Sequence, residues 1–235
     1  MATLTAPIPQ AADEIIYPES DGKRMADSTE QARWMTFLYS NLENWYKEDP
    51  NVFVAIDLLW YPVKGESKTT YAPDVMLVFG RPKFPRRSYL QWEENDVAPQ
   101  VVFEIVSRTN TPGEMMAKSA FYQRYGVEEC YLYDPDTGSL EVVLFTPQGL
   151  QYIAVQHEWT SPRLGIRFVP VARAPMEVYL PDGEPFRTLA EQTALTRFHS
   201  ERADAERERA DAERAAKERL ADKLRALGID PDTIE

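Results

Sequence analysis

Tyr71-Ala-Pro-Asp-Val-Met-Leu-Val78 and Val101-Val-Phe-Glu-Ile-Val106 are two strand-like runs that each carry one acidic residue. Asp74 lies where the first predicted strand begins, and Glu104 lies inside the second. Because the neighbours of Glu104 are all apolar, both faces of its strand are expected to be covered. An ionised glutamate in such surroundings is costly unless it is paired, hydrogen-bonded or metal-bound. A buried salt bridge or a neutral acid is the structural interpretation, and a metal ligand is the functional one.

A helix is predicted directly after the Glu104 strand. Thr111-Pro-Gly-Glu114 combines an N-cap, a proline at the first helical position and a glutamate at the third, and Gly126 predicts the end. On the helical wheel Lys118 lies in the middle of an apolar arc formed by Phe121, Tyr125, Tyr122 and Met115. Such a lysine usually extends its aliphatic stem toward solvent. If it faces a carboxylate pair, its ammonium could hold the attacking water or stabilise charge in a transition state.

Asp74 and Glu104 are most informative as a pair. Two carboxylates about 4 Å apart repel each other by roughly 4 kcal/mol at an effective dielectric constant near 20, so a close pair needs a cation. Oxygen ligands of this kind suit Mg²⁺ or Mn²⁺ rather than zinc. The two histidines, His157 and His199, are isolated and offer no zinc-type spacing. Asp74 and Glu104 are therefore the candidate metal ligands, and together with Lys118 they are the candidate catalytic residues.

The predicted elements follow one another in an order typical of an α/β fold. A helix begins at Ser28, with Gln31 in the capping-box position, and ends near Trp45-Tyr46. A strand is expected over 51–61, where Asp57 interrupts the apolar run, and the Asp74 and Glu104 strands come next. Further strands are expected at 127–133, 140–145, 150–155, 166–169 and 176–180. This order predicts a sheet of mixed direction flanked by helices.

Three regions are expected along the chain. Residues 1–13 contain two prolines among small polar residues and should be a flexible N-terminus. Residues 14–187 should form the globular domain, and 188–235 a charged C-terminal helical arm. In the arm, Glu-Arg-Ala-Asp-Ala-Glu-Arg occurs twice in tandem, but neither helical register offers the large apolar seam of a stable coiled coil. We favour a solvated arm that pairs weakly with a partner helix at its leucine-containing end.

Composition limits the class of protein. The chain has 235 residues and a net charge of −12, which argues against a general nucleic-acid coat protein. It does not argue against a nuclease, because a bound metal neutralises a carboxylate site locally. The one cysteine, Cys130, excludes an intramolecular disulfide and is expected to be a small buried hydrophobe. There is no signal-peptide pattern and no run of roughly 20 apolar residues, so we expect a soluble, cytoplasmic protein without a membrane partner.

A set of motifs in fixed order resembles a known family. The motifs are Pro73-Asp74, Glu104-Ile-Val-Ser107, Lys118-x-x-x-Tyr122-x-x-x-Gly126-Val and Tyr131-Leu-Tyr-Asp134. They resemble a restriction-endonuclease-like family that is abundant in photosynthetic bacteria and belongs to the PD-(D/E)xK nuclease superfamily. The resemblance implies a restriction-endonuclease-like mixed sheet, with Asp74 and Glu104 as Mg²⁺ ligands. The superfamily places its lysine two residues after the acid, where this chain has Val106, but the family supplies one from the following helix, which Lys118 matches.

The resemblance also implies supporting residues. Ser107 matches the serine of the family's Glu-x-x-Ser, and Tyr122 lies within its helical motif. Glu30 would correspond to an acid that some superfamily members use on the first helix. Glu114 stands where the family often has an aspartate, which is a departure from the pattern.

Two functions are compatible with these features. The first is a Mg²⁺- or Mn²⁺-dependent DNA endonuclease, in which Lys83, Arg86 and Arg87 of the basic loop 81–87 could contact backbone phosphates. DNA would be its partner, and a homodimer would let two sites cut two strands. The alternative is a non-catalytic interaction protein on a nuclease-like fold that works through its C-terminal helix. The net charge of −12 and the lack of an obvious DNA-binding module favour this alternative.

Overall fold

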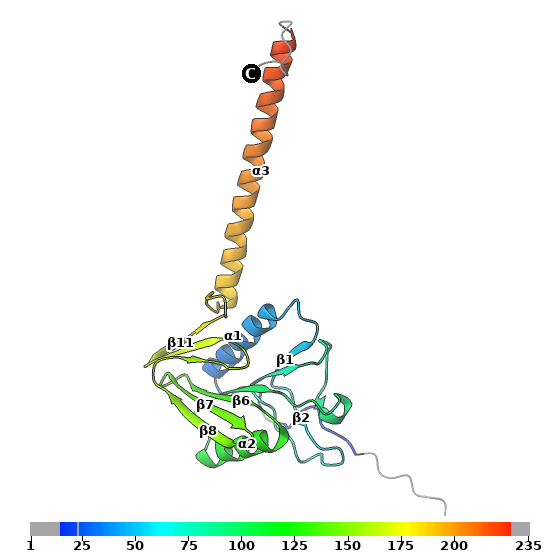
Figure 1. Ribbon diagram of the computed structural model, residues 1–235, viewed down its shortest axis with the longest axis vertical. Helices are drawn as coiled ribbons and strands as arrows, with labels where there is room; N and C mark the ends of the chain where they lie inside the picture. Colours follow the sequence, from blue (N-terminus) through cyan, green and yellow to red (C-terminus); the bar gives the residue numbers. More distant parts are fainter. Residues whose placement is uncertain (1–14, 23, 227–235) are drawn as a thin grey trace, which may run out of the picture. The chain divides into compact units, whose positions relative to one another are not determined.

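The structure of this chain, a computed structural model, describes residues 15–22 and 24–226. The chain divides into two compact units, with the boundary between Phe186 and Arg187, and each is described by itself. The first unit contains the sheets and two helices, and the second contains the long C-terminal helix (Figure 1). The predicted flexible N-terminus, 1–13, lies outside the described residues.

A six-stranded sheet organises the first unit, with the strand order β1-β3-β5-β6-β7-β8. Strands β5 and β6 are parallel, and the other neighbours are antiparallel. Helix α2 (Pro112–Tyr125) joins the parallel pair, because a parallel connection must return to the same end of the sheet. The strands are Val52–Ile56 (β1), Val75–Phe79 (β3), Val101–Ile105 (β5), Glu129–Asp134 (β6), Ser139–Thr146 (β7) and Gly149–Val155 (β8). The predicted α/β sheet of mixed direction is therefore confirmed.

Two smaller sheets complete this unit. Strands β9 (Trp159–Thr160), β10 (Arg167–Val171) and β11 (Ala174–Tyr179) form an antiparallel sheet. Strands β2 (Trp60–Tyr61) and β4 (Tyr89–Leu90) pair in parallel, and a short 3₁₀ helix, η1 (Gln91–Glu93), follows β4. The sequence did not predict β4 or β9, because two residues are too few to show the alternation that marks a strand.

Two hydrophobic cores cover the two faces of the large sheet. In β3, Val75 and Leu77 belong to the core that contains helix α1 (Thr29–Trp45), whereas Met76 and Val78 belong to the core that contains α2. Figure 1 shows the two helices on opposite sides of the sheet. Side chains alternate between faces along a strand, so the position of a polar residue in β3 or β5 decides which helix it can meet.

The helix boundaries follow the predicted capping signals. The Ser28 side chain caps α1 by accepting a hydrogen bond from the Gln31 backbone N–H. Thr111 and Glu114 form the complete capping box of α2, and Gly126 ends that helix with a left-handed φ of 99°. The Gln31 side chain does not complete a capping box: its Oε1 accepts from the N–H of Asp27, which leaves its amide NH₂ for another partner.

The second unit contains helix α3 (Leu189–Ala226), which opens with a capping box between Thr188 and Glu191. No residue of this helix is buried. Pairs of opposite charge run along it, and Glu213 with Lys217 at 2.8 Å is one of them. The sequence predicts that this helix ends at Gly228, with Pro231 just beyond, and both residues lie outside the described residues. None of the helices that the structure describes has the length and apolar character needed to cross a bilayer.

Candidate active site

The register of β3 and β5 brings the two candidate acids together. Val75 pairs with Phe103 in this antiparallel ladder. Asp74 directly precedes Val75 and Glu104 directly follows Phe103, so the two acids occupy the next opposed position. Both residues are buried, with 7% of Asp74 and 3% of Glu104 exposed. Two segments that lie 30 residues apart thus place their acids side by side at one end of the sheet.

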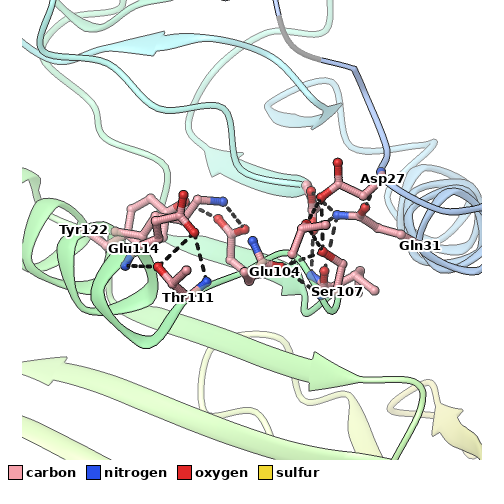
Figure 2. A network of polar contacts seen from close by, with 12 residues as sticks. Asp27, Gln31, Glu104, Ser107, Thr111, Glu114 and Tyr122 are labelled. Carbon is pink, nitrogen blue, oxygen red and sulfur yellow. Dashed lines mark hydrogen bonds and ion pairs between the residues drawn. The ribbon is translucent and has the colours of Figure 1, made fainter.

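Helix α2 provides two donors to Glu104. The Lys118 ammonium lies 2.5 Å from Glu104 Oε2, and the Tyr122 hydroxyl donates to Glu104 Oε1. Lys118 and Tyr122 are one helical turn apart, so they share a face of α2. Figure 2 shows this face of the helix turned toward Glu104. Lys118 therefore reaches the buried acid instead of extending its stem into solvent, and only 19% of its side chain is exposed.

Asp74 is held by backbone and side-chain donors from two other elements. The N–H of Ile105 donates to Asp74 Oδ2 at 2.6 Å. The Gln31 Nε2 group lies 3.4 and 3.3 Å from the two Asp74 oxygens and 3.3 Å from the carbonyl oxygen of Ile105. Sequence analysis missed this role of Gln31, because a glutamine three residues after Ser28 is already explained as part of a helix cap.

Glu30 lies in a different environment from its neighbour Gln31. Its carboxylate is 3.6 Å from the guanidinium of Arg33, and 47% of its side chain is exposed. The side chain of α1 that contacts Asp74 is therefore an amide and not the acid suggested by the resemblance.

Ser107 belongs to a neighbouring polar cluster. Its Oγ lies 3.1 Å from Asp27 Oδ2 and 3.1 Å from Asn110 Oδ1, and Thr109 also donates to Asp27. Figure 2 shows Ser107 on the Asp27 and Gln31 side of the network, beyond Glu104. Because the N–H of Asp27 donates to Gln31, the cluster is linked to Asp74 through that glutamine.

The charges in the site influence one another. Burial and, second, repulsion from Glu104 raise the pKa of Asp74 to about 7, although the Ile105 N–H, Lys118 and Gln31 act in the opposite direction. Burial lowers the pKa of Lys118, but attraction to Glu104 and the hydrogen bond with it raise that pKa overall, so the ammonium is protonated at neutral pH. Burial, assisted by Glu104, raises the pKa of Tyr122 well above its ordinary value, so the hydroxyl acts as a donor.

A pocket of about 520 Å³ opens beside these residues, and Asp74, Lys118, Gln31, Arg24 and Tyr71 are among those lining it. Asp57 also lines the pocket. It follows β1, and its N–H donates to the carbonyl of Asp74 at 3.2 Å. Its φ of 46° lies in the left-handed region, which explains why the predicted 51–61 strand is divided at this residue.

A divalent metal ion fits the donor set of Asp74 and Glu104. Carboxylate oxygens are hard ligands, and Mg²⁺ is commonly held by one or two carboxylates while water and phosphate oxygens fill its other positions. In the part of the chain that the structure describes, no group of three or more His, Cys, Asp or Glu residues is arranged to hold a metal. Among the described residues, a metal held by Asp74 and Glu104 would therefore complete its coordination with oxygens other than a third carboxylate. Added positive charge would also relieve the repulsion that raises the pKa of Asp74.

The basic loop 81–87 does not present a free cationic surface. Arg81 and Arg86 both bind Glu94, at 2.7 and 2.6 Å, and only 3% of the Arg86 side chain is exposed. Lys83 pairs with Glu43 at 3.2 Å, and Arg87 pairs with Glu19 at 2.8 Å. The expectation that Arg86 contacts DNA is wrong, because its guanidinium is buried between Glu94 and the rings of Phe53 and Phe84. For Lys83 and Arg87 a phosphate contact stays a prediction.

A search of curated proteins found no match. Among solved structures, the chain resembles a putative nuclease belonging to DUF820 from Anabaena variabilis, with a TM-score of 0.44 and 14% sequence identity over 57% of this chain and 72% of that chain. Residues 13–170 match the Uma2 family, which is described as "Putative restriction endonuclease". Because this match covers more than half of the chain, the protein belongs to the Uma2 family of restriction-endonuclease-like proteins.

Proposed function

We propose that this protein is a divalent-metal-dependent endonuclease that hydrolyses phosphodiester bonds in DNA. The observation that carries the proposal is the convergence of three residues: Asp74 and Lys118 line one pocket, and the buried Glu104, opposite Asp74 in the β3–β5 ladder, binds Lys118. Family membership supports a nuclease, and the choice of DNA as substrate follows from the family's description. The cytoplasmic location stays a prediction.

Asp74 and Glu104 would hold Mg²⁺ or Mn²⁺ at the end of the sheet. When bound, the metal would act as a Lewis acid toward the scissile phosphate and lower the pKa of a water molecule. The protein's own contribution is to fix the two carboxylates before the substrate arrives. Tyr122 and Lys118 orient Glu104, and the Ile105 N–H and Gln31 orient Asp74. Such pre-positioned donors require little reorganisation during the reaction.

Lys118 has a second role in this proposal. One of its ammonium hydrogens is used by Glu104, and the other two can reach into the pocket that Lys118 lines. A protonated amine there can donate to the attacking water or to a phosphate oxygen whose negative charge grows in the transition state. Because Lys118 remains protonated, it acts as a hydrogen-bond donor and a positive charge, and not as the base that deprotonates the water.

The direct test is cleavage of supercoiled plasmid in Mg²⁺ or Mn²⁺, compared between the wild type and Glu104→Gln. We expect the wild type to nick the plasmid and the variant to lose at least 100-fold in rate, a loss typical of removing one electrostatic contributor. Glu129→Gln is the matched control, because Glu129 is also 3% exposed and also accepts from a tyrosine, Tyr131, away from the pocket. No cleavage by the wild type in either metal, with any DNA form, would reject the proposal.

The alternative is an interaction protein that works through α3. No residue of this helix is buried, and this observation supports the alternative. The two functions are separated by comparing a variant truncated after residue 187 with Asp74→Ala. If the truncation changes assembly while Asp74→Ala changes neither cleavage nor the stabilisation by Mn²⁺, the interaction protein is the better description.

A further inference from the structure

Strand β8 forms one edge of the large sheet. It pairs with β7 along its whole length, from Leu140 opposite Val155 to Thr146 opposite Gly149. In the part of the chain that the structure describes, no other strand pairs with it. One side of its backbone is therefore left without a neighbouring strand.

The alternation of hydrogen bonds identifies which residues face this open side. The N–H of Phe145 donates to the carbonyl of Glu128 at 2.9 Å, so the odd-numbered residues of β7 bond toward β6 and the even-numbered residues bond toward β8. In β8 the residues opposite these even positions are Gln151, Ile153 and Val155. Their neighbours Leu150, Tyr152 and Ala154 must then direct their N–H and C=O groups away from the sheet.

The same three residues also carry exposed side chains. Leu150 is 46% exposed and Tyr152 is 55% exposed. They lie opposite Phe145 and Val143, which belong to the core on the α2 side, so they share that face of the sheet. The segment Gly149-Leu-Gln-Tyr-Ile-Ala-Val155 contains no charge and no proline. Charged residues and proline are the usual means of preventing edge strands from pairing, and β8 has neither.

We propose that β8 pairs with β8 of a second copy of this chain in an antiparallel arrangement, with Tyr152 on the twofold axis. The strand is complementary to itself in this register. Tyr152 meets Tyr152 of the partner subunit as a hydrogen-bonded pair, and Leu150 meets Ala154 of the partner subunit, so the outward N–H and C=O groups satisfy one another. A contact that uses the same patch on both subunits closes as a dimer and does not propagate.

Charge limits where two copies of this chain can make contact. The chain has a net charge of −12, so two copies repel one another over most of their surfaces. Because β8 is uncharged, pairing it with itself places no like charges opposite one another. The exposed Leu150 and Tyr152 side chains would be covered by the partner's residues of the same face. This proposal does not depend on nuclease activity, and either one can fail without the other.

The first test is a disulfide at the proposed axis. Opposed residues in a hydrogen-bonded antiparallel pair have Cα atoms about 5.5 Å apart, within the roughly 4.4–6.8 Å range that disulfides span. In the full chain, Tyr152→Cys should give a covalent dimer under mild oxidation. Gln151→Cys is the matched control, because that exposed residue lies one position from the axis with its side chain on the other face. The wild-type Cys130 is buried and should not crosslink.

The second test removes the pairing without removing the strand. Because the N–H of Ala154 points away from β7, Ala154→Pro should leave the β7–β8 ladder intact while it blocks a bond to the partner. Analytical ultracentrifugation at concentrations up to about 200 μM measures the oligomeric state, and high concentrations are needed because a single strand pair buries little surface. The wild type and Ala154→Ser should dimerise. Ala154→Pro should be monomeric, and its circular dichroism spectrum should match that of the wild type. A monomeric wild type, or a dimer unaffected by Ala154→Pro with Tyr152→Cys failing to crosslink, would overturn the proposal.

Discussion

Glu104 is a buried carboxylate within an apolar strand. An ionised carboxylate that is 3% exposed loses most of its hydration, and this loss must be offset by partners inside the protein. Lys118 provides an opposite charge and Tyr122 provides a hydroxyl donor, one to each carboxylate oxygen. The three side chains therefore form a unit in which the removal of one member leaves another without its partner.

Lys118→Met tests this dependence. The variant leaves the Glu104 carboxylate buried without its counter-charge, and breaking a buried pair in this way typically costs about 3–5 kcal/mol in the free energy of unfolding. In Lys118→Met/Glu104→Gln no charge is left unpaired, so the double variant should lose less stability than Lys118→Met alone. Urea titrations of the wild type, both single variants and the double variant measure the coupling. Strictly additive losses would contradict a paired arrangement.

Asp74 makes stability depend on pH when no metal is present. Its pKa is about 7 in the folded chain against an ordinary value of 3.8, so between these pH values the folded state binds the proton more tightly than the unfolded state. The free energy of unfolding contributed by this group therefore falls as pH rises from about 4 to about 7, by up to roughly 4 kcal/mol at 1.36 kcal/mol per pKa unit. Asp74→Asn cannot ionise and should lack this decline.

The measurement is chemical denaturation in EDTA at several pH values between about 4 and 8. The difference in the free energy of unfolding between the wild type and Asp74→Asn gives the contribution of the Asp74 carboxyl group. Saturating Mn²⁺ at the upper pH should stabilise the wild type and leave Asp74→Asn unchanged, because the metal removes the repulsion between the two carboxylates. Parallel pH profiles for the two proteins would show that Asp74 is ionised in both the folded and the unfolded state.

The candidate site was predictable where a polar residue conflicts with its local pattern. Glu104 stands in an apolar strand, and Lys118 stands in the apolar arc of α2, so each residue needs a partner that its own segment does not supply. Gln31 could not be found in this way, because its position near the start of α1 has a local explanation in helix capping. Its contact with Asp74 depends on how α1 meets β3 and β5, which no single segment encodes.

At the scale of the elements, the longer helices and strands followed from the sequence, and the shortest strands did not. Helix α2 has clear signals at both ends, and strand β5 is a continuous apolar run that contains only one polar residue, Glu104. Strand β4 contains two residues, and its parallel pairing with β2 depends on the path of the loop between them. Asp57 interrupts an apolar run of the sequence, but its left-handed backbone and its place beside Asp74 are properties of the assembled sheet.

The basic loop 81–87 is an element whose role the structure changes. Arg86 binds Glu94 in a buried ion pair and stacks on Phe53 and Phe84. Because Phe53 belongs to β1, this contact holds the loop against the large sheet. Arg86→Ala should lower the free energy of unfolding by about 3 kcal/mol, because Glu94 keeps only Arg81 as a buried partner. At temperatures where the variant is folded, its DNA affinity should equal that of the wild type.

The control for this prediction is Arg87→Ala in the same loop. The Arg87 side chain is 83% exposed and pairs with Glu19 on the surface, so its removal should leave the melting temperature unchanged. Calorimetry of both variants, with a DNA-binding titration at low salt, separates a structural arginine from a phosphate contact. Weaker DNA binding by folded Arg86→Ala would contradict the structural role.

At the scale of the whole molecule, charge limits how the protein can meet a polyanion. The net charge is −12, and the cations of the basic loop are each bonded to a glutamate. The lining of the pocket contains five acidic residues (Asp21, Asp27, Asp57, Asp74 and Glu114) against two cationic ones, Arg24 and Lys118. Binding to DNA would then depend on the bound metal and on few direct phosphate contacts, unlike the many contacts of a protein with a continuous basic face.

This charge distribution predicts a shallow dependence of cleavage on monovalent salt. A protein that makes 6–10 phosphate contacts loses about 10³–10⁵ in affinity between 50 and 200 mM salt, because each contact releases a counterion. With about three contacts the loss over the same range would be below roughly 50-fold. The second-order rate of plasmid nicking, measured at fixed saturating Mg²⁺ and increasing KCl, tests this directly. Lys118→Met should reduce the rate and, because Lys118 would itself contact the reacting phosphate, lower the salt slope by about one. A decline of a thousandfold would mean that other cations of the chain contact the DNA backbone, and the surface lysines and arginines outside the pocket would then have to be substituted one by one.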